Sequence, residues 1–150
     1  MDKLIASLRL VLGNTFVMYF KAHSYHWNVE GHYFHMFHDF FGEIYEDVYG
    51  AVDPFAEELR KADAYAPISL MELYNYKTIA EDNAKPATCH EMLINLLEAN
   101  SQLLAALSHL FDIATAEKQQ GLANFVADRM DKHKKFEWQI HASLKNLGEV

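Results

Sequence analysis

The sequence predicts an all-α protein, built as a four-helix bundle with one long crossover connection. Apolar residues recur at spacings of three and four over most of the 150 residues, which is the period of amphipathic helices. Four such segments have similar lengths, and a long irregular stretch, residues 64–87, separates the second segment from the third. A chain of this length defaults to one domain, so we expect residues 1–150 to form a single domain.

The first helix is predicted from Leu4 to about the Asn28–Gly31 region, where Gly31 is expected to end it in a left-handed conformation. The second helix is predicted to be about 28 residues long, because apolar residues recur from Phe34 to Leu59. Pro54 lies inside this second helix and cannot donate a hydrogen bond to the carbonyl four residues earlier. We therefore expect a kink or a break there.

Residues 64–87 hold two prolines and little sustained pattern, so they are predicted to be the connection, in which Ser69 caps a short helix. A third long helix follows from the apolar spacing between Leu93 and Ala114, and a fourth from Gly121 to Leu147. The long connection lets the chain cross the bundle instead of turning back tightly. The expected fold is therefore a ferritin-like four-helix bundle.

Composition excludes several classes of protein. Thirteen Lys and Arg against twenty-one Asp and Glu give a formal net charge of -8, and neither end carries a Lys-rich tail, so direct DNA binding is not expected. No run of about 18 apolar residues is present, and Asp2 interrupts the start of the chain, so we expect neither a membrane span nor a signal peptide. The single cysteine, Cys89, fits a reducing, cytoplasmic compartment.

The segment from Lys21 to Arg60 is the most informative part of the chain. Between its two ends it contains no Lys or Arg, but five histidines and eight carboxylates. Imidazole and carboxylate together suit intermediate cations such as ferrous iron, zinc or manganese. The lack of compensating cations makes the segment acidic, so it should also attract cations.

Four residues of this segment are the candidate catalytic residues and metal ligands: His26, His38, Asp53 and Glu57. The chain has no Glu-x-x-His motif, so a di-metal centre inside the bundle is not expected. Asp53 and Glu57 lie four residues apart and share a helix face. His38 and Asp53 lie roughly 22 Å apart along a helix, so one ion with ligands about 2 Å away cannot touch both. If all four bind one metal, they must come from two subunits of a two-fold dimer.

Each candidate also has a purely structural interpretation. His26 can be a core histidine bonded to a backbone carbonyl. Asp53 can cap a helix that is broken before Pro54, and Glu57 can be a solvated surface residue.

The remaining polar and aromatic groups are expected to be structural. His133 and Glu137, on the fourth helix, are expected to form a buried polar pair rather than a metal site. Trp27 is expected in the core. Surface or structural roles are expected for the other histidines of the segment, which are His23, His32 and His35.

The stretch KAHSYHWNVEGHYFHMFH contains a His-Trp-Asn motif, a glycine, an aromatic residue and a second histidine twelve positions after the first. An aspartate follows fifteen residues later and a glutamate four residues after that. This pattern resembles the signature of the Dps family, the miniferritins that protect DNA during starvation. The residues that match are His26, His38, Asp53 and Glu57, whereas Glu58 replaces the family's arginine.

The resemblance implies a dodecameric shell of identical subunits, with ferroxidase sites at two-fold interfaces and ferric mineral in the cavity. It implies that the four matching residues bind iron, and that hydrogen peroxide or dioxygen oxidises ferrous iron there, which protects against oxidative damage. Gly42 departs from the family, which has a carboxylate at this position, and Glu43 points about 100° away around the helix. We therefore expect a weak second iron position, and a higher occupancy of it in Gly42→Asp. Asn124 also stands where the family's pore commonly has an aspartate.

Two other classes of function stay open. The first is a ferritin-like shell whose metal site is weakened or inactive, because of Gly42 and Pro54, and which acts as a structural or DNA-associated protein. The second is direct DNA binding, which the charge of -8 disfavours.

Overall fold

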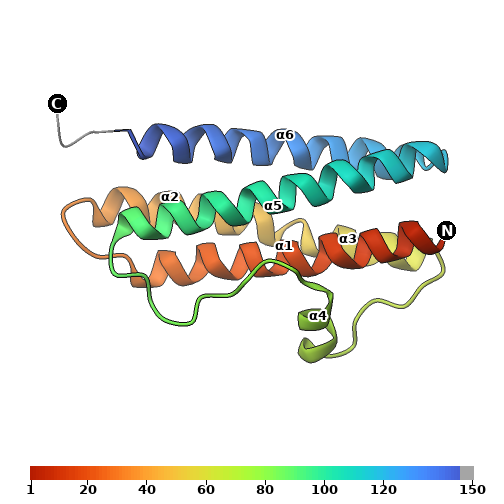
Figure 1. Cartoon of the computed structure of the whole chain (residues 1–150), viewed down its shortest axis with the longest axis horizontal. Helices are drawn as coiled ribbons and strands as arrows, with labels where there is room; N and C mark the ends of the chain where they lie inside the picture. Colours follow the sequence, from red (N-terminus) through yellow and green to blue (C-terminus); the bar gives the residue numbers. More distant parts are fainter. Residues whose placement is uncertain (146–150) are drawn as a thin grey trace.

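The computed structural model describes residues 1–145, in which six helices and no strand are found. In Figure 1 the long helices α1, α5 and α6 lie side by side with a further rod, in which α2 and α3 are arranged end to end. The all-α four-helix prediction is confirmed. The helices are α1 (Asp2–Asn28), α2 (Phe34–Tyr49), α3 (Val52–Lys61), α4 (Leu70–Tyr76), α5 (Cys89–Ala116) and α6 (Gln120–Ser143).

The core is built from the apolar stripes that the sequence predicted. Leu8, Phe41, Leu96 and Val126, one from each rod, are completely buried between them. Burying such side chains stabilises the fold by about 1.5–3 kcal/mol each. The predicted end of the fourth stripe, Leu147, lies outside the described residues.

By length and composition, helix α1 is long and apolar enough to cross a membrane. However, 56% of its most apolar 18-residue stretch is buried within the bundle. It packs against α2, α3, α4 and α5. Its apolar character is therefore that of a core helix, and it does not indicate a membrane protein.

The predicted second helix is broken into α2 and α3 at Gly50 and Ala51. Pro54 explains the position of the break, because a proline ring clashes with the carbonyl four residues earlier, which here belongs to Gly50. The Ala51 N–H instead bonds the carbonyl three residues back, at Val48, with a distance of 3.0 Å. The expected break is confirmed, and α3 still continues along α1 (Figure 1).

The predicted end of the first helix was partly wrong. Helix α1 ends at Asn28 with Val29 in an extended conformation, so the chain has already left the helix before Gly31. Gly31 has a φ of 112° in the turn that leads to α2, and this conformation is one that glycine adopts readily. The glycine therefore shapes the turn rather than capping the helix.

The crossover between α3 and α5 runs along α1 and is fastened to it by polar groups. The Asn14 side chain, buried on α1, accepts hydrogen bonds from the backbone N–H groups of Thr78 and Ile79 at 2.8 and 3.0 Å. Further along, the buried Lys21 ammonium pairs with Asp82 at 3.0 Å. The Asn14 bonds satisfy backbone groups of an irregular segment that lies against the core, and the Lys21–Asp82 ion pair ties the same segment to α1.

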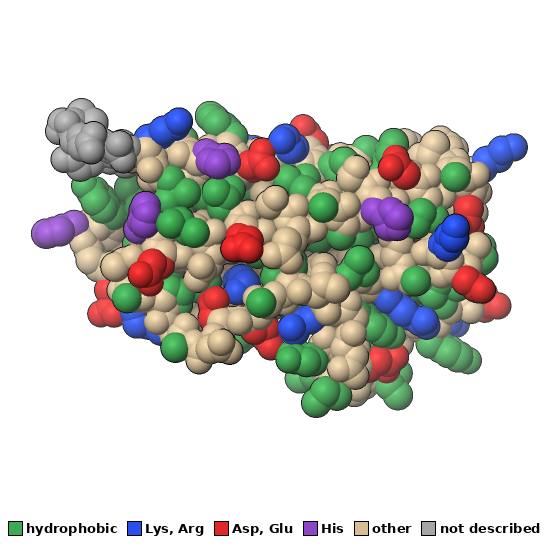
Figure 2. Space-filling model, viewed as in Figure 1, with side chains coloured by type: hydrophobic (Ala, Val, Ile, Leu, Met, Phe, Trp, Pro, Cys, Tyr) green, Lys and Arg blue, Asp and Glu red, His purple; other side chains and the backbone are tan. Residues whose placement is uncertain are grey.

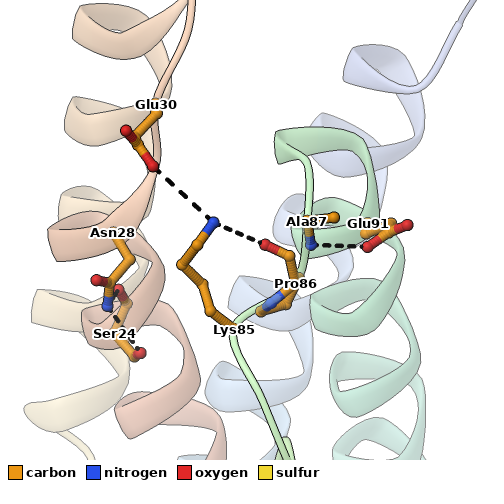
Figure 3. A network of polar contacts seen from close by, with 7 residues as sticks. All are labelled: Ser24, Asn28, Glu30, Lys85, Pro86, Ala87 and Glu91. Carbon is orange, nitrogen blue, oxygen red and sulfur yellow. Dashed lines mark hydrogen bonds and ion pairs between the residues drawn. The ribbon is translucent and has the colours of Figure 1, made fainter.

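The two ends of the crossover are also fixed. The predicted cap at Ser69 is confirmed, because its hydroxyl accepts from the Glu72 N–H at 3.1 Å and opens α4. At the other end, Figure 3 shows Lys85 reaching toward Glu30, just beyond α1, at 4.0 Å. The Lys85 ammonium also donates to the Pro86 carbonyl at 3.1 Å, so it holds the last residues before α5 against the tip of α1 (Figure 3).

A polar network lies at the centre of the bundle. His133 on α6 is 1% exposed, and its Nδ1 donates to Asn100 Oδ1 on α5 at 2.9 Å. Its Nε2 lies 3.0 Å from a guanidinium nitrogen of Arg129, which also pairs with Asp47 on α2 at 2.9 Å. The expected pair between His133 and Glu137 is therefore wrong. Glu137 instead pairs with Lys134 on its own helix, at 2.8 Å.

The His133 network predicts a specific acid sensitivity. Burial, reinforced by the Arg129 charge, lowers the pKa of His133 from 6.5 to about 3. Below pH 6.5 the unfolded chain therefore binds a proton at His133 that the folded chain does not bind. The free energy of unfolding consequently decreases as the pH falls from 6.5 toward 3. We expect a slope of about 1.4 kcal/mol per pH unit from this group.

Urea unfolding at several pH values and one fixed protein concentration measures this slope. His133→Gln should remove it while retaining a polar partner for Asn100, whereas His109→Gln, at an exposed position of α5, should leave it unchanged. Equal slopes in the wild type and His133→Gln would contradict the assignment.

Candidate metal centre

The turn between α1 and α2 brings His26 and His38 together. Their rings stack with centroids 3.7 Å apart and an angle of 18° between the planes. His26 Nδ1 donates to the backbone carbonyl of His38, and His38 Nδ1 donates to the backbone carbonyl of His26, both at 2.6 Å. This reciprocal arrangement fixes both rings against the junction of the two helices.

The hydrogen bonds decide which nitrogen of each ring is available. A carbonyl accepts only from an N–H, so each Nδ1 carries a proton, and Nε2 is the nitrogen whose lone pair a metal ion can use. Metal-binding histidines are commonly oriented in this way by a backbone carbonyl. The structural interpretation of His26 as a histidine bonded to a carbonyl is therefore correct, and it is compatible with a ligand role.

Gly42 lies directly against this pair. A Cβ atom at Gly42 would lie 3.2 Å from His26 Nδ1 and 3.3 Å from His26 Cε1, which is tighter than an ordinary van der Waals contact. The ring cannot retreat freely, because it is bonded to the His38 carbonyl and stacked on the His38 ring. Glycine at this position thus makes room for the His26 imidazole, in addition to omitting a carboxylate.

The two carboxylates lie on α3, beyond the break in the second rod. Asp53 and Glu57 are exposed and four residues apart, so their side chains lie on one face of the helix. Among residues 1–145, no group of three or more His, Cys, Asp or Glu side chains lies close enough to hold a metal. The structure thus brings the two histidines together, and it leaves the two carboxylates as a separate pair.

The structural interpretation of Asp53 as a helix cap does not hold. Helix α3 begins at Val52 with Ala51 as its N-cap, so Asp53 is the second helical residue, and no side chain caps this end. Its carboxylate nevertheless lies in the first turn, where the partial positive charge of the helix favours an anion. The prediction that Trp27 lies in the core is also wrong, since it is 57% exposed.

Aromatic residues around the histidines were missed by the sequence analysis. Tyr45 on α2 stacks on His23 with centroids 3.7 Å apart and an interplanar angle of 6°, and it lies 5.2 Å from the His26 ring. The Tyr19 hydroxyl lies 2.9 Å from His23 Nδ1. A signal was present, because Tyr19 precedes His26 by seven residues and Tyr45 follows His38 by seven, and seven residues are close to two turns of helix.

Comparison with known proteins agrees with this fold. A sequence model of the ferritin-like domain, from the ferritin family, matches residues 5–150. The chain is therefore a ferritin-like protein, and its relatives place it more narrowly: it belongs to the Dps family of miniferritins.

Among those relatives, a DNA protection during starvation protein of Helicobacter pylori is 24% identical over 91% of this chain and 95% of its own length. Antigen TpF1 of Treponema pallidum has a crystal structure with a TM-score of 0.91 and 28% identity, covering 96% of this chain and 92% of that one. A Dps protein from Vibrio cholerae, described as a member of a broad superfamily of ferritin-like diiron-carboxylate proteins, matches with a TM-score of 0.90 and 26% identity. That match covers 96% of this chain and 90% of the other.

Proposed function

We propose that this protein is a ferroxidase and iron-storing miniferritin, whose substrate is ferrous iron. The observation that carries the proposal is the reciprocally bonded pair of His26 and His38, in which Nδ1 of each ring is bonded to a carbonyl and Nε2 is the nitrogen left for a metal ion. Neutral imidazole nitrogen is a suitable ligand for ferrous iron, and nearby carboxylates offset the additional charge of the ferric product. Membership of a ferritin-like family supports iron over zinc or manganese.

We propose that Asp53 and Glu57 of a second subunit complete the site. Within one chain the carboxylate pair is separate from the histidine pair, and one ion cannot bridge the length of helix between them. A two-fold axis that sets two α2–α3 rods antiparallel would place each carboxylate pair at the partner's histidines. Hydrogen peroxide or dioxygen would take the electron from ferrous iron there, and the ferric product would move into the shell as mineral.

The subunit surface supports assembly into a shell. Large apolar side chains around α4 are strongly exposed, including Ile68 at 93%, Leu70 at 76% and Met71 at 68%. Figure 2 shows hydrophobic side chains projecting at the lower edge of the molecule, where α4 lies in the view of Figure 1. Exposed apolar surface of this extent marks protein–protein contact. We propose a cytoplasmic homo-oligomer of twelve subunits, as in the Dps family.

Assembly is testable independently of iron. Light scattering and sedimentation at micromolar protein should find one species of twelve subunits, because the shared site requires at least a dimer. Leu70→Glu together with Met71→Glu should shift the population toward smaller species, since a carboxylate in an apolar interface is costly. The matched change Asn75→Glu, at an exposed position on the same helix, should have a smaller effect. A monomeric wild type would refute both the shell and the shared site.

Measurements on the assembled shell distinguish a ferroxidase from a structural protein whose metal site is inactive. Oxygen or peroxide consumption with added ferrous iron tests for a ferroxidase, whereas an assembled shell that consumes neither would be a structural protein with an inactive site. With a formal charge of -8 per chain, any protection of DNA should be indirect, through removal of iron and peroxide.

A further inference from the structure

A groove lies between α2 and α6, at the end of the bundle where α2 begins and α6 ends (Figure 1). Helix α2 packs mainly against α1, and α6 packs mainly against α5, so space remains between α2 and α6. The groove has a volume of about 440 Å³, within the range of about 300–1,000 Å³ that is typical of small-molecule sites. We call it the α2–α6 groove, and its chemistry is set by the side chains Met36, Phe37, Asp39, Phe40, Glu43 and Trp138.

Most of the lining of the α2–α6 groove is apolar, and three of its side chains are aromatic. Phe37 is buried and belongs to the core of the bundle, whereas Trp138 is 65% exposed and Met36 is 52% exposed. The face of an indole ring carries partial negative charge, so it attracts a cation as well as an apolar group. The groove therefore offers a large aromatic surface that the described part of the chain does not cover.

Two carboxylates line the same groove without a cation beside them. Asp39 and Glu43 are exposed and lie one turn apart on α2, so their side chains share one side of the helix. Among residues 1–145, neither carboxylate takes part in an ion pair. The described lining also contains no Lys or Arg. The α2–α6 groove is thus negatively charged as well as apolar.

The next turn of α2 shows which group such a carboxylate binds between these two helices. Asp47 follows Glu43 by four residues, so it continues the same side of α2. Its carboxylate lies 2.9 Å from a guanidinium nitrogen of Arg129, which reaches across from α6. At the position of Asp39 and Glu43, α6 contributes no corresponding cation to the groove. A cation from outside the chain can therefore take the place there that Arg129 takes at Asp47.

We propose that the α2–α6 groove binds an organic monocation, in which an ammonium group is attached to an aromatic body. Asp39 and Glu43 accept hydrogen bonds from the ammonium group, and Trp138 contacts the aromatic body. The site is separate from the candidate metal centre, because His38 faces α1 whereas the groove lies on the α6 side of α2. The proposal goes beyond the proposed function and does not depend on it. The alternative occupant is a second copy of the chain.

Isothermal titration calorimetry on the full-length assembled protein, without iron, tests the proposal. Three probes share an indole ring and differ in charge: tryptamine is a cation, tryptophol is neutral and indole-3-propionate is an anion. We expect one tryptamine per chain, with tryptophol bound about tenfold more weakly and no binding of indole-3-propionate. Ethylammonium keeps the charge without the ring, and it should also bind about tenfold more weakly than tryptamine. Tryptamine that binds no more tightly than tryptophol or ethylammonium would overturn the proposal.

Variants locate the binding site. Asp39→Asn together with Glu43→Gln should weaken tryptamine binding by about tenfold and leave tryptophol binding unchanged, because only the charged group loses its partners. Trp138→Leu should weaken the binding of both probes. The matched control is Glu98→Gln together with Asp112→Asn, which removes two exposed carboxylates from α5 and changes the net charge equally. An equal loss of tryptamine affinity in the two double variants would mean general attraction by the acidic chain, and it would refute the site.

The assembled state distinguishes a ligand from a second copy of the chain. If a neighbouring subunit occupied the groove, tryptamine would not bind the assembled protein, and Trp138→Glu would shift the population toward smaller species in light scattering. That pair of results would overturn the proposal. Ferrous iron oxidation by Asp39→Asn with Glu43→Gln should equal that of the wild type, since neither residue belongs to the proposed ligand set. A wild type that binds tryptamine in the groove but does not oxidise iron would refute only the proposed function.

Discussion

Replacing His38 or Glu57 by alanine is expected to slow ferrous iron oxidation by about a hundredfold, since even outer-shell partners of a metal site commonly contribute ten- to a hundredfold. His38 supplies one of the two Nε2 donors, and its carbonyl also accepts the bond that fixes His26. Glu57 supplies negative charge for the ferric product. Stopped-flow absorbance of ferric iron, with anaerobic ferrous protein mixed with peroxide or dioxygen, measures the initial rate.

The matched controls are His35→Ala and Glu58→Ala, which remove the same side-chain types from positions outside the proposed ligand set. Neither should slow oxidation by more than a few-fold, and light scattering should find the shell intact in all four variants. Unchanged initial rates in both His38→Ala and Glu57→Ala would refute the assignment.

Mixing the two inactive variants tests whether the site is shared between chains. In a dimer of one His38→Ala chain and one Glu57→Ala chain, one site loses both groups and the other keeps both. Random co-assembly of equal amounts should therefore restore about a quarter of the wild-type activity. If all ligands came from one chain, every site in the mixture would stay defective, and no activity would return.

Gly42→Ala is expected to weaken ferrous iron binding by about tenfold, although alanine is the better helix former by about 1 kcal/mol. The new methyl group would meet His26 Nδ1 at 3.2 Å, so the ring must shift and its 2.6 Å bond to the His38 carbonyl must loosen. Titration with ferrous iron or a redox-inert divalent ion, read by calorimetry, measures the affinity.

Gly121→Ala is the matched control, because it also replaces a helical glycine, and no atom lies within 4 Å of its new methyl group. It should leave iron affinity unchanged. Equal affinities in Gly42→Ala and the wild type would show that His26 tolerates the displacement.

The same contact changes the expectation for Gly42→Asp. From the sequence alone, an aspartate at this position would simply supply the missing carboxylate and raise the occupancy of a second iron position. In the structure its Cβ would press against the His26 ring. We therefore expect the gain in occupancy of the second iron position to be accompanied by weaker binding at the first, where His26 is a ligand. Anomalous scattering from metal-soaked crystals would locate both positions in the variant and in the wild type.

The sequence by itself determined the helices and their order, because the period of apolar residues is a local property that directly reflects which face of a helix is buried. It also determined that the second rod breaks, since Pro54 cannot donate to Gly50 in any helical context. The separation of His38 from Asp53 likewise follows from helix rise alone, which is why a shared site could be inferred without any structure.

Tertiary structure decided what depends on contacts between helices. The reciprocal bonds of His26 and His38, the close approach of Gly42, and the stacking of Tyr45 on His23 all join α1 to α2 across a turn, and no spacing within one helix specifies them. His133 shows the same limit. Its position on the buried face was predictable, but its partners were not. Asn100 bonds to it from α5, and Asp47 on α2 is linked to it through Arg129. Glu137, on the same helix as His133, pairs with Lys134 instead. Periodicity specifies which face of each helix is buried, and only the packing of the helices specifies which polar groups meet there.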